Sequence, residues 1–193
     1  NHYYAVSLLS FLLLLVPAHR YASVDTLIWP RIRRETVPRW TIGIFRLQLG
    51  AVYFFAGVAK LNSDWLLRAM PMAIWLPAKS DLPILGQFFG LKWVAVAFSW
   101  AGAVYDLFIA FFLMWKPTRW LAYIAVVVFH MMTWWLFPIG MFPFIMILST
   151  LIFFPADWPH RQFQRIRTLL PAKTSQTGPP ASADSTATES PFR

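Results

Sequence analysis

The chain has 193 residues, of which 58% are hydrophobic and only 13% are charged, against about 25% charged residues in average globular proteins. Its apolar segments are too long and too closely spaced for a soluble domain, so we expect a polytopic membrane protein. The formal charge of +9 does not indicate nucleic-acid binding, because the basic residues lie in the connections between apolar segments. With no cysteine, disulfides and thiol chemistry are excluded.

Five apolar segments predict an all-α bundle. A helix needs about 20 residues to cross the hydrocarbon, so the second, third and fourth segments are predicted to span the membrane. The first is shorter, and the fifth suits a short span or a re-entrant hairpin. The five segments cover residues 3–16, 41–59, 91–115, 120–137 and 141–154.

The stretch from residue 64 to 90 is interrupted by three prolines and predicts an interfacial helix plus a loop against the membrane. Trp65 and Trp75 in this stretch suit the headgroup region, where tryptophan is enriched. After residue 154 the composition changes. We expect a basic surface helix at residues 162–170 and a disordered polar tail at 171–193.

These features divide the chain into a transmembrane domain, residues 1–160, and a basic and polar extension, residues 161–193. The chain starts at Asn1 rather than at methionine, so we expect it to be a fragment. The connection 18–40, the connection 116–119 and the tail hold most of the arginines, and the more basic side is expected to be cytoplasmic. Lys60 would then lie at the non-cytoplasmic face.

Lys60 is the most informative residue, because it ends an almost unbroken apolar run. Arg46, Tyr53, Gly57 and Lys60 are spaced by 7, 4 and 3 residues, which places them within a stripe of about 60° on one helix. Desolvation disfavours a charged amine, and a neutral amine is a base, so we predict Lys60 to be catalytic. The alternative is that Arg46 and Lys60 extend toward opposite interfaces as anchors.

Two more ionisable residues lie inside the predicted spans. Asp106 shares a helix face with Ser99 and Gly102, and a carboxylate inside a span normally has a partner within the protein. A structural pairing with Arg46 or with a tryptophan is at least as well supported as catalysis. His130 shares a face with Tyr123 and Trp134, and a lone histidine there is more often a packing residue than a ligand.

The four histidines lack the close spacing of metal ligands, so we predict no protein-built metal site. Phosphate-binding loops and serine-nucleophile motifs are also absent. From the residues alone, the bundle could be an enzyme acting on a lipid-soluble substrate or a proton-coupled transporter.

Several short motifs follow one another along the chain in a recognisable order. They are Asn1-His2-Tyr3, Ser23-Val24-Asp25, Tyr53-Phe54-Phe55-Ala56-Gly57-Val58-Ala59-Lys60-Leu61, Asp64-Trp65, Asp106-Leu107, Phe129-His130, Phe137-Pro138-Ile139-Gly140-Met141-Phe142 and Trp158-Pro159. By these motifs the chain resembles the vitamin K-dependent gamma-carboxylase family, which shares the HTTM domain with bacterial relatives. The resemblance covers residues 1 to about 161.

The resemblance implies that Lys60 is the catalytic base, with His2 and His130 as assisting residues. Asn1 is paired with His2 in the family motif, and we predict Asn1, Arg46, Tyr53 and Asp106 to contribute to the cofactor site, Asp106 as a structural orienter. The implied cofactor is reduced vitamin K or a related quinol, with O2 and CO2 as co-substrates and no metal. The implied reaction couples quinol epoxidation to carboxylation of a glutamate in a protein substrate.

Two departures from the animal enzymes keep alternatives open. Ala59 stands where those enzymes are expected to have a second lysine, and this chain ends in a polar tail instead of a large lumenal portion. A quinol oxygenase without carboxylation is one alternative. A non-enzymatic transporter or membrane scaffold is the other. In each case we expect the lipid bilayer as a partner and no nucleic acid.

Overall fold

A computed structural model describes residues 2–21, 23–155 and 157–158, and within these ranges all regular structure is helical. The chain divides into two compact units, residues 1–156 and 157–193. The helix predicted at residues 162–170 and the tail predicted at 171–193 lie outside the described residues.

Three long helices confirm the three predicted spans: α3 (Arg39–Ala59), α7 (Lys92–Met114) and α8 (Arg119–Leu136). All three are long and apolar enough to cross a membrane, which supports an integral membrane protein. Proline sets two of their limits. Pro38 precedes α3, and Pro138 follows α8 closely, where it disfavours helical geometry at Phe137.

The first and fifth apolar segments form shorter helices. These are α1 (His2–Leu15) and α9 (Phe142–Thr150), the latter continued by the 3-10 turn η4 (Leu151–Phe153). Both are apolar, but neither reaches the length of a simple membrane crossing. Three helices are therefore long enough to span the membrane, and a bundle of five spans remains a prediction.

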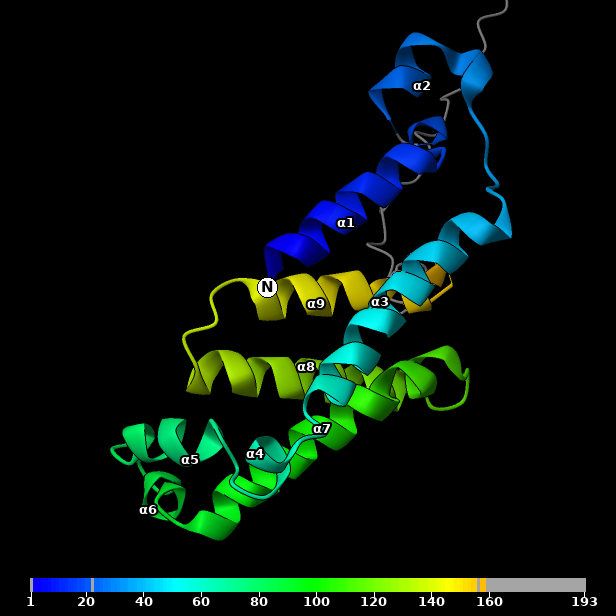
Figure 1. The fold of residues 1–193 in the computed structure, drawn as a ribbon. Helices are drawn as coiled ribbons and strands as arrows, with labels where there is room; N and C mark the ends of the chain where they lie inside the picture. Colours follow the sequence, from blue (N-terminus) through cyan, green and yellow to red (C-terminus); the bar gives the residue numbers. More distant parts are fainter. Residues whose placement is uncertain (1, 22, 156, 159–193) are drawn as a thin grey trace, which may run out of the picture. The chain divides into compact units, whose positions relative to one another are not determined.

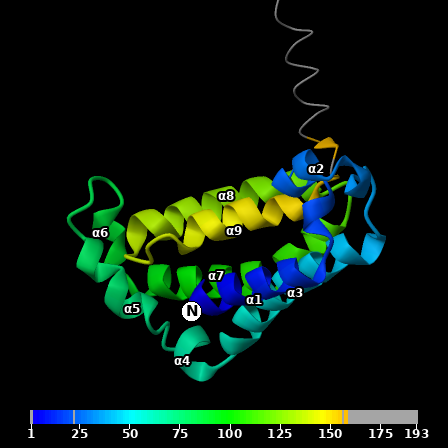
Figure 2. The same ribbon diagram turned by 90° about the horizontal axis from the view of Figure 1, so that it is seen from above.

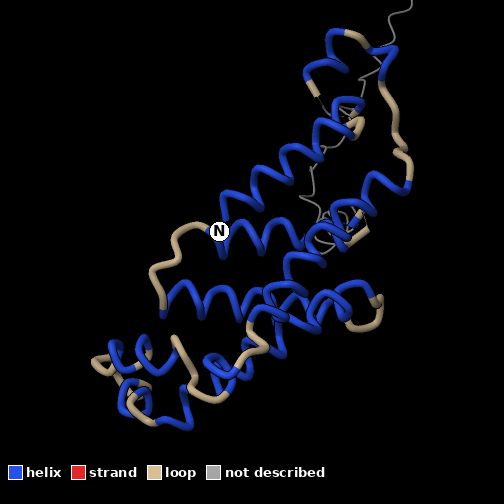
Figure 3. Tube along the Cα trace, in the orientation of Figure 1, coloured by secondary structure: helices blue, strands red, loops and turns tan. Residues whose placement is uncertain are grey.

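Short helical turns fill the two long connections. Between α1 and α3 lie η1 (Ala18–Arg20), α2 (Val24–Ile28) and η2 (Pro30–Ile32). Between α3 and α7 lie α4 (Ser63–Leu66), α5 (Met72–Trp75), η3 (Pro77–Lys79) and α6 (Gly86–Phe89). The prediction of one interfacial helix here was too simple, because the prolines at 71, 77 and 83 limit each turn to a few residues (Figure 3).

The helices of the first unit form two layers. Helices α8 and α9 lie side by side in one layer, and α1, α3 and α7 form the other (Figures 1 and 2). The turns α4 to α6 gather at one end of α7. The most extensive helix pair is α3 with α7. This pair is close because Gly57 has no side chain: a Cβ there would lie 2.7 Å from the backbone nitrogen of Leu107.

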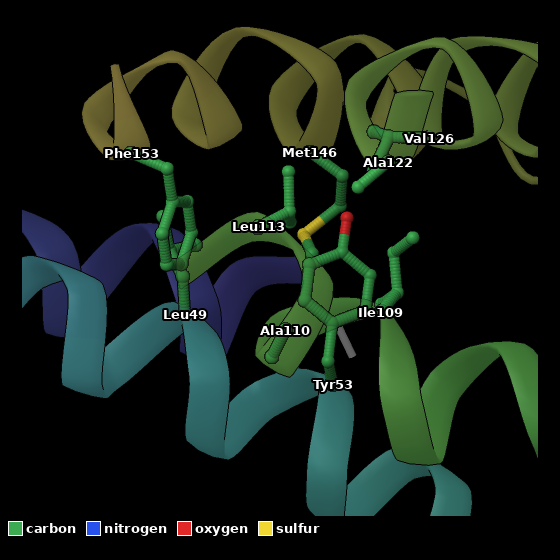
Figure 4. Close-up of a cluster of buried hydrophobic side chains, with 9 residues drawn as sticks. All are labelled: Leu49, Tyr53, Ile109, Ala110, Leu113, Ala122, Val126, Met146 and Phe153. Atoms are coloured by element: carbon green, nitrogen blue, oxygen red, sulfur yellow. The ribbon is translucent and has the colours of Figure 1, made fainter. Parts of the chain in front are cut away.

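Buried apolar side chains form two clusters. Cluster one joins α3, α7, α8 and α9 and contains Leu49, Tyr53, Ile109, Ala110, Leu113, Ala122, Val126, Met146 and Phe153 (Figure 4). Cluster two joins α5 and α6 to α7 and the end of α8, and contains Ala69, Met72, Leu76, Phe89, Val94, Ala95, Leu136 and Phe137. Members of both clusters line one cavity, together with a few polar side chains.

Candidate functional site

Lys60 is held in place by the way α3 ends. The side chain of Asn62 donates a hydrogen bond to the Ala59 carbonyl and accepts one from the backbone N–H of Trp65, at 2.9 Å each. Asn62 thus closes α3 and caps α4, a common use of asparagine. This cap brings the side chains of residues 60 and 65 together, so that the Lys60 ammonium lies 5.2 Å from the centroid of the Trp65 ring.

The partner of Lys60 is Asp106. Lys60 Nζ lies 2.5 Å from Asp106 Oδ2 and 3.1 Å from the carbonyl oxygen of Ala56. The two side chains keep only 19% and 10% of their surface exposed, so this is a largely desolvated ion pair. The predicted pairing of Asp106 with Arg46 or a tryptophan is therefore wrong. The prediction that Ser99, Gly102 and Asp106 share an inward face is confirmed, because all three are buried.

A cavity of about 600 Å³ adjoins this pair. Its walls are largely apolar, and polar side chains are confined to a few positions. Its lining residues include Tyr53, Lys60, Trp65, Trp75, Gly102, Asp106, His130, Phe137 and Phe142. The site is thus an apolar chamber with one ion pair in its wall, a composition typical of pockets for small ligands. Lys60, Asp106, His130 and Tyr53 all line it, although they come from three helices.

His130 is buried among aromatic rings. Its Nδ1 lies 2.9 Å from the Val126 carbonyl, one turn earlier in α8. A carbonyl oxygen can only accept, so a neutral His130 carries its proton on Nδ1 and keeps Nε2 as an acceptor. The rings of Tyr53, Tyr105, Phe129 and Phe142 lie 5.5 to 6.3 Å from the imidazole. Trp134, expected on the same face, is instead half exposed.

Tyr53 contributes its ring to the cavity and directs its hydroxyl elsewhere. The hydroxyl lies 3.4 Å from Thr150 Oγ1, and Thr150 in turn donates to the Met146 carbonyl. Because the Thr150 proton is used in that second bond, Tyr53 is the donor in the first. Figure 4 shows the Tyr53 hydroxyl pointing from α3 toward Met146. Tyr53 therefore links α3 to α9 behind the cavity wall.

Arg46 lies away from the cavity. Its guanidinium donates to the carbonyl oxygens of Ile152, Phe153 and Phe154, at 2.9, 3.3 and 3.4 Å. These carbonyls follow the end of α9, where helix geometry leaves acceptors without intrahelical donors. Arg46 thus binds a helix terminus and is neither a free anchor nor a partner of Asp106. Its predicted contribution to cofactor binding stays a prediction, now without a contact to the cavity.

Two predicted site residues cannot be located. Asn1 lies outside the described residues, and so does the side chain of His2. Among the residues that the structure describes, no group of three His, Cys, Asp or Glu side chains could hold a metal ion.

Sequence reasoning missed the aromatic residues that complete the chamber. Trp65 was assigned to the headgroup region, yet its indole N–H donates to the Ser99 carbonyl at 2.9 Å and its ring lies beside Lys60. Trp75 packs on Phe137 with ring centroids 5.4 Å apart, and both line the cavity. The sequence did mark these residues, because Asp64-Trp65 and Phe137 to Phe142 belong to the motifs that carry the family resemblance. The spacing of these motifs along the chain did not predict that they line the same cavity.

A family model described as HTTM domain matches residues 1–158. The matched region includes every cavity-lining residue named above. No solved structure matches the chain.

Proposed function

Because the chain belongs to the HTTM domain family, and this domain is found in vitamin K-dependent gamma-carboxylase family members, we propose that it is a membrane-embedded enzyme acting on a reduced lipid quinone. The observation that carries this proposal is the Lys60–Asp106 pair in the wall of a 600 Å³ apolar chamber. A transporter of protons or of a polar solute would need a polar route through the bundle. The described walls offer polar side chains at only a few positions.

The chamber suits a quinol on two grounds. Its volume and its aromatic walls fit a fused-ring quinol, and its few polar groups suit a ligand with two hydroxyls. When bound, a reduced vitamin K-type quinol supplies a site that reacts with O2 once it has been ionised. The residues of the chain then have three tasks, which are to hold the ring, to take one proton from a hydroxyl and to exclude water.

The number of protons that Lys60 and Asp106 carry together determines how the pair can act as a base. In the ion-paired form, Lys60 carries three N–H protons and Asp106 carries none on its carboxylate. Uptake of one proton gives an ammonium beside a neutral carboxyl group. Lys60 Nζ can pass a proton to Asp106 Oδ2 while receiving one from the ligand, so the pair acts as the base and Asp106 stores the proton. This refines the sequence-based hypothesis of a solitary neutral amine.

His130 is proposed to orient the ligand. Its Nε2 remains an acceptor, because Nδ1 is engaged by Val126, and a quinol hydroxyl is a matching donor. The surrounding rings hold the imidazole in one orientation, which favours a fixed direction for this hydrogen bond. His2 and Asn1, implied by the family motif, are proposed as further assisting residues.

We further propose that the enzyme uses this chamber to carboxylate glutamate. The second candidate function is a quinol oxygenase that does not carboxylate. One observation favours the second. Among the described lining residues there is no lysine or arginine besides Lys60, and its charge is already matched by Asp106. A substrate carboxylate would find no free lysine or arginine there.

The test gives the purified full chain a vitamin K quinol and O2 and measures epoxide by mass spectrometry. We expect oxygen-dependent epoxide from the wild type and a loss of about 100-fold or more in Lys60→Gln, the usual scale for removing a general base. Glutamine removes the cation but can still donate a hydrogen bond to Asp106, so it should destabilise the fold less than an apolar residue at position 60.

Arg68→Gln is the matched control, because Arg68 forms an exposed ion pair with Asp64 and does not line the chamber. Its epoxide yield should equal that of the wild type. A wild type that makes no epoxide, or a Lys60→Gln variant that makes as much as Arg68→Gln, would refute the assignment. Adding a glutamate peptide and labelled CO2 to the same reaction separates the carboxylase from the oxygenase.

A further inference from the structure

A second cavity lies beside the chamber on the other side of a shared wall. It measures about 290 Å³, roughly half the volume of the chamber. It is lined by residues of α6, α7 and α8 and by Leu85, and every one of them is apolar or aromatic. They are Leu85, Phe88, Phe89, Trp93, Val94, Ala97, Phe98, Met132, Trp135 and Leu136.

Three residues line both cavities: Ala97, Phe98 and Met132. Two of them, Ala97 and Met132, can leave a passage open. Ala97 extends no further than its Cβ, and Met132 has a flexible, unbranched side chain that adapts to what lies beside it. Phe98 packs edge-on against Phe89, with ring centroids 6.2 Å apart, so its ring forms part of the second cavity's wall. The two cavities therefore meet at a point that small shifts of side chains can open.

The two cavities differ in chemistry. The chamber is lined by the ion pair and His130, whereas none of the described residues that line the second cavity is titratable. A ligand that fills both must have a polar head at one end and a purely apolar extension at the other. We propose that the second cavity binds the isoprenoid or alkyl tail of the quinol whose ring occupies the chamber, entering past Ala97.

This inference rests on the proposed function and narrows it to tailed quinols. It commits to the tail of the same ligand because the cavities share a wall. An independent lipid chain would not need the chamber at all. An experiment can distinguish the quinol tail from an independent lipid chain. The tail can occupy the second cavity only if the ring of the same molecule fits beside the ion pair.

The test uses the full chain in detergent with a naphthoquinone that carries a photoreactive diazirine at the tail end. After illumination, labelled peptides are mapped by mass spectrometry. We expect labelling within residues 85–94 and 132–136, reduced by an excess of the unmodified tailed quinone. Labelling spread evenly over the exposed apolar surface, or confined to other helices, would overturn the proposal.

Two variants sharpen the result. Ala97→Phe fills the junction and should weaken binding of the tailed quinone by about tenfold, equivalent to losing the burial of about two methylene groups. Ala97 also lines the chamber, but the tail-less 2-methyl naphthoquinone has no chain that must pass the junction, so its binding should weaken by less than about threefold. Val104→Phe is the matched control, because Val104 is an exposed residue of the same helix that lines neither cavity. It should leave both affinities unchanged. A tenfold loss for both quinones in Ala97→Phe, or for neither, contradicts the tail site.

Gly102→Phe tests whether the ring site and the tail site are occupied by one ligand or by two separate ligands. A Cβ at Gly102 meets no atom within 4 Å and Gly102 lines the chamber, so a side chain added there begins in open space and takes up room meant for the ring. If the ring and tail belong to one ligand, this variant loses tail labelling in the second cavity. Persistent labelling would mean an independent lipid-chain site and would overturn the proposal. Failure of the proposed function looks different, because then the tail-less quinone would not bind the wild type.

Discussion

At the scale of single residues, the account depends on two side chains that are 46 positions apart in the chain. Lys60 is placed by the end of α3, and Asp106 by the inward face of α7. Neither is stable in an apolar site without the other, because an uncompensated buried charge is strongly unfavourable. The pair is therefore structural and chemical at once, and variants must be chosen to separate the two effects.

A double-mutant cycle of stability measurements tests the structural role of the pair separately from its chemical role. Lys60→Met leaves Asp106 without a cation and should lower the free energy of unfolding by about 3 kcal/mol or more. Adding Asp106→Asn to Lys60→Met should recover most of that loss, because no charge is then left buried. Thermal unfolding in detergent measures all three proteins. Arg68→Met, at an exposed ion pair, should cost less than about 1 kcal/mol.

Equal losses in Lys60→Met and in the double variant would contradict a desolvated pair. They would mean that Asp106 is satisfied by water when Lys60 is absent.

The sequence predicted the members of this site better than their arrangement. Lys60, Asp106 and His130 stood out because ionisable groups are rare in apolar segments. The pairing of Lys60 with Asp106 could not be predicted, because helical periodicity orients a residue on its own helix and does not tell which helices are neighbours. The contact of Trp65 with Lys60 could not be predicted either, since it depends on the cap made by Asn62.

At the scale of elements, the packing of α3 on α7 brings Lys60 to Asp106. Gly57 permits that packing, because a Cβ there would lie 2.7 Å from both the backbone nitrogen and the Cγ of Leu107. Gly43, on the same helix, meets no atom within 4 Å. The two glycines therefore predict opposite effects of the same substitution.

Gly57→Ala should destabilise the protein by about 1–3 kcal/mol, the usual cost of overpacking, and should also reduce epoxide formation by shifting α3. Gly43→Ala should stabilise it by about 0.5–1 kcal/mol, because alanine loses less backbone freedom in a helix. Thermal unfolding compares the two variants under one condition. The packing account is wrong if both substitutions shift the unfolding temperature in the same direction.

The helices themselves were largely predictable. The three long apolar segments agree with α3, α7 and α8 to within two residues at their limits, because each is a long apolar run bounded by proline or by basic residues. The stretch 64–90 was not predictable in detail. Its three prolines rule out a long helix but leave the order and length of the short turns to tertiary packing against α7.

At the scale of the whole molecule, the three candidate spans and the charge of +9 make different predictions about membrane attachment. Attachment by surface charge is weakened by salt, which screens it, whereas spanning helices are not released by salt. We expect the chain to stay in the membrane pellet after washing with high salt and with alkaline carbonate, and to be extracted only by detergent. Release by salt alone would contradict an integral membrane protein.

The most direct test of the central claim is anaerobic ionisation of the quinol by the Lys60–Asp106 pair. Absorbance difference spectra of the purified chain mixed with vitamin K quinol, without oxygen, report the quinol anion before any later step. The account predicts an anion band with the wild type and with Arg68→Gln, and none with Lys60→Gln. An anion band of equal size in Lys60→Gln, or no band in the wild type although the quinol is bound, would contradict it.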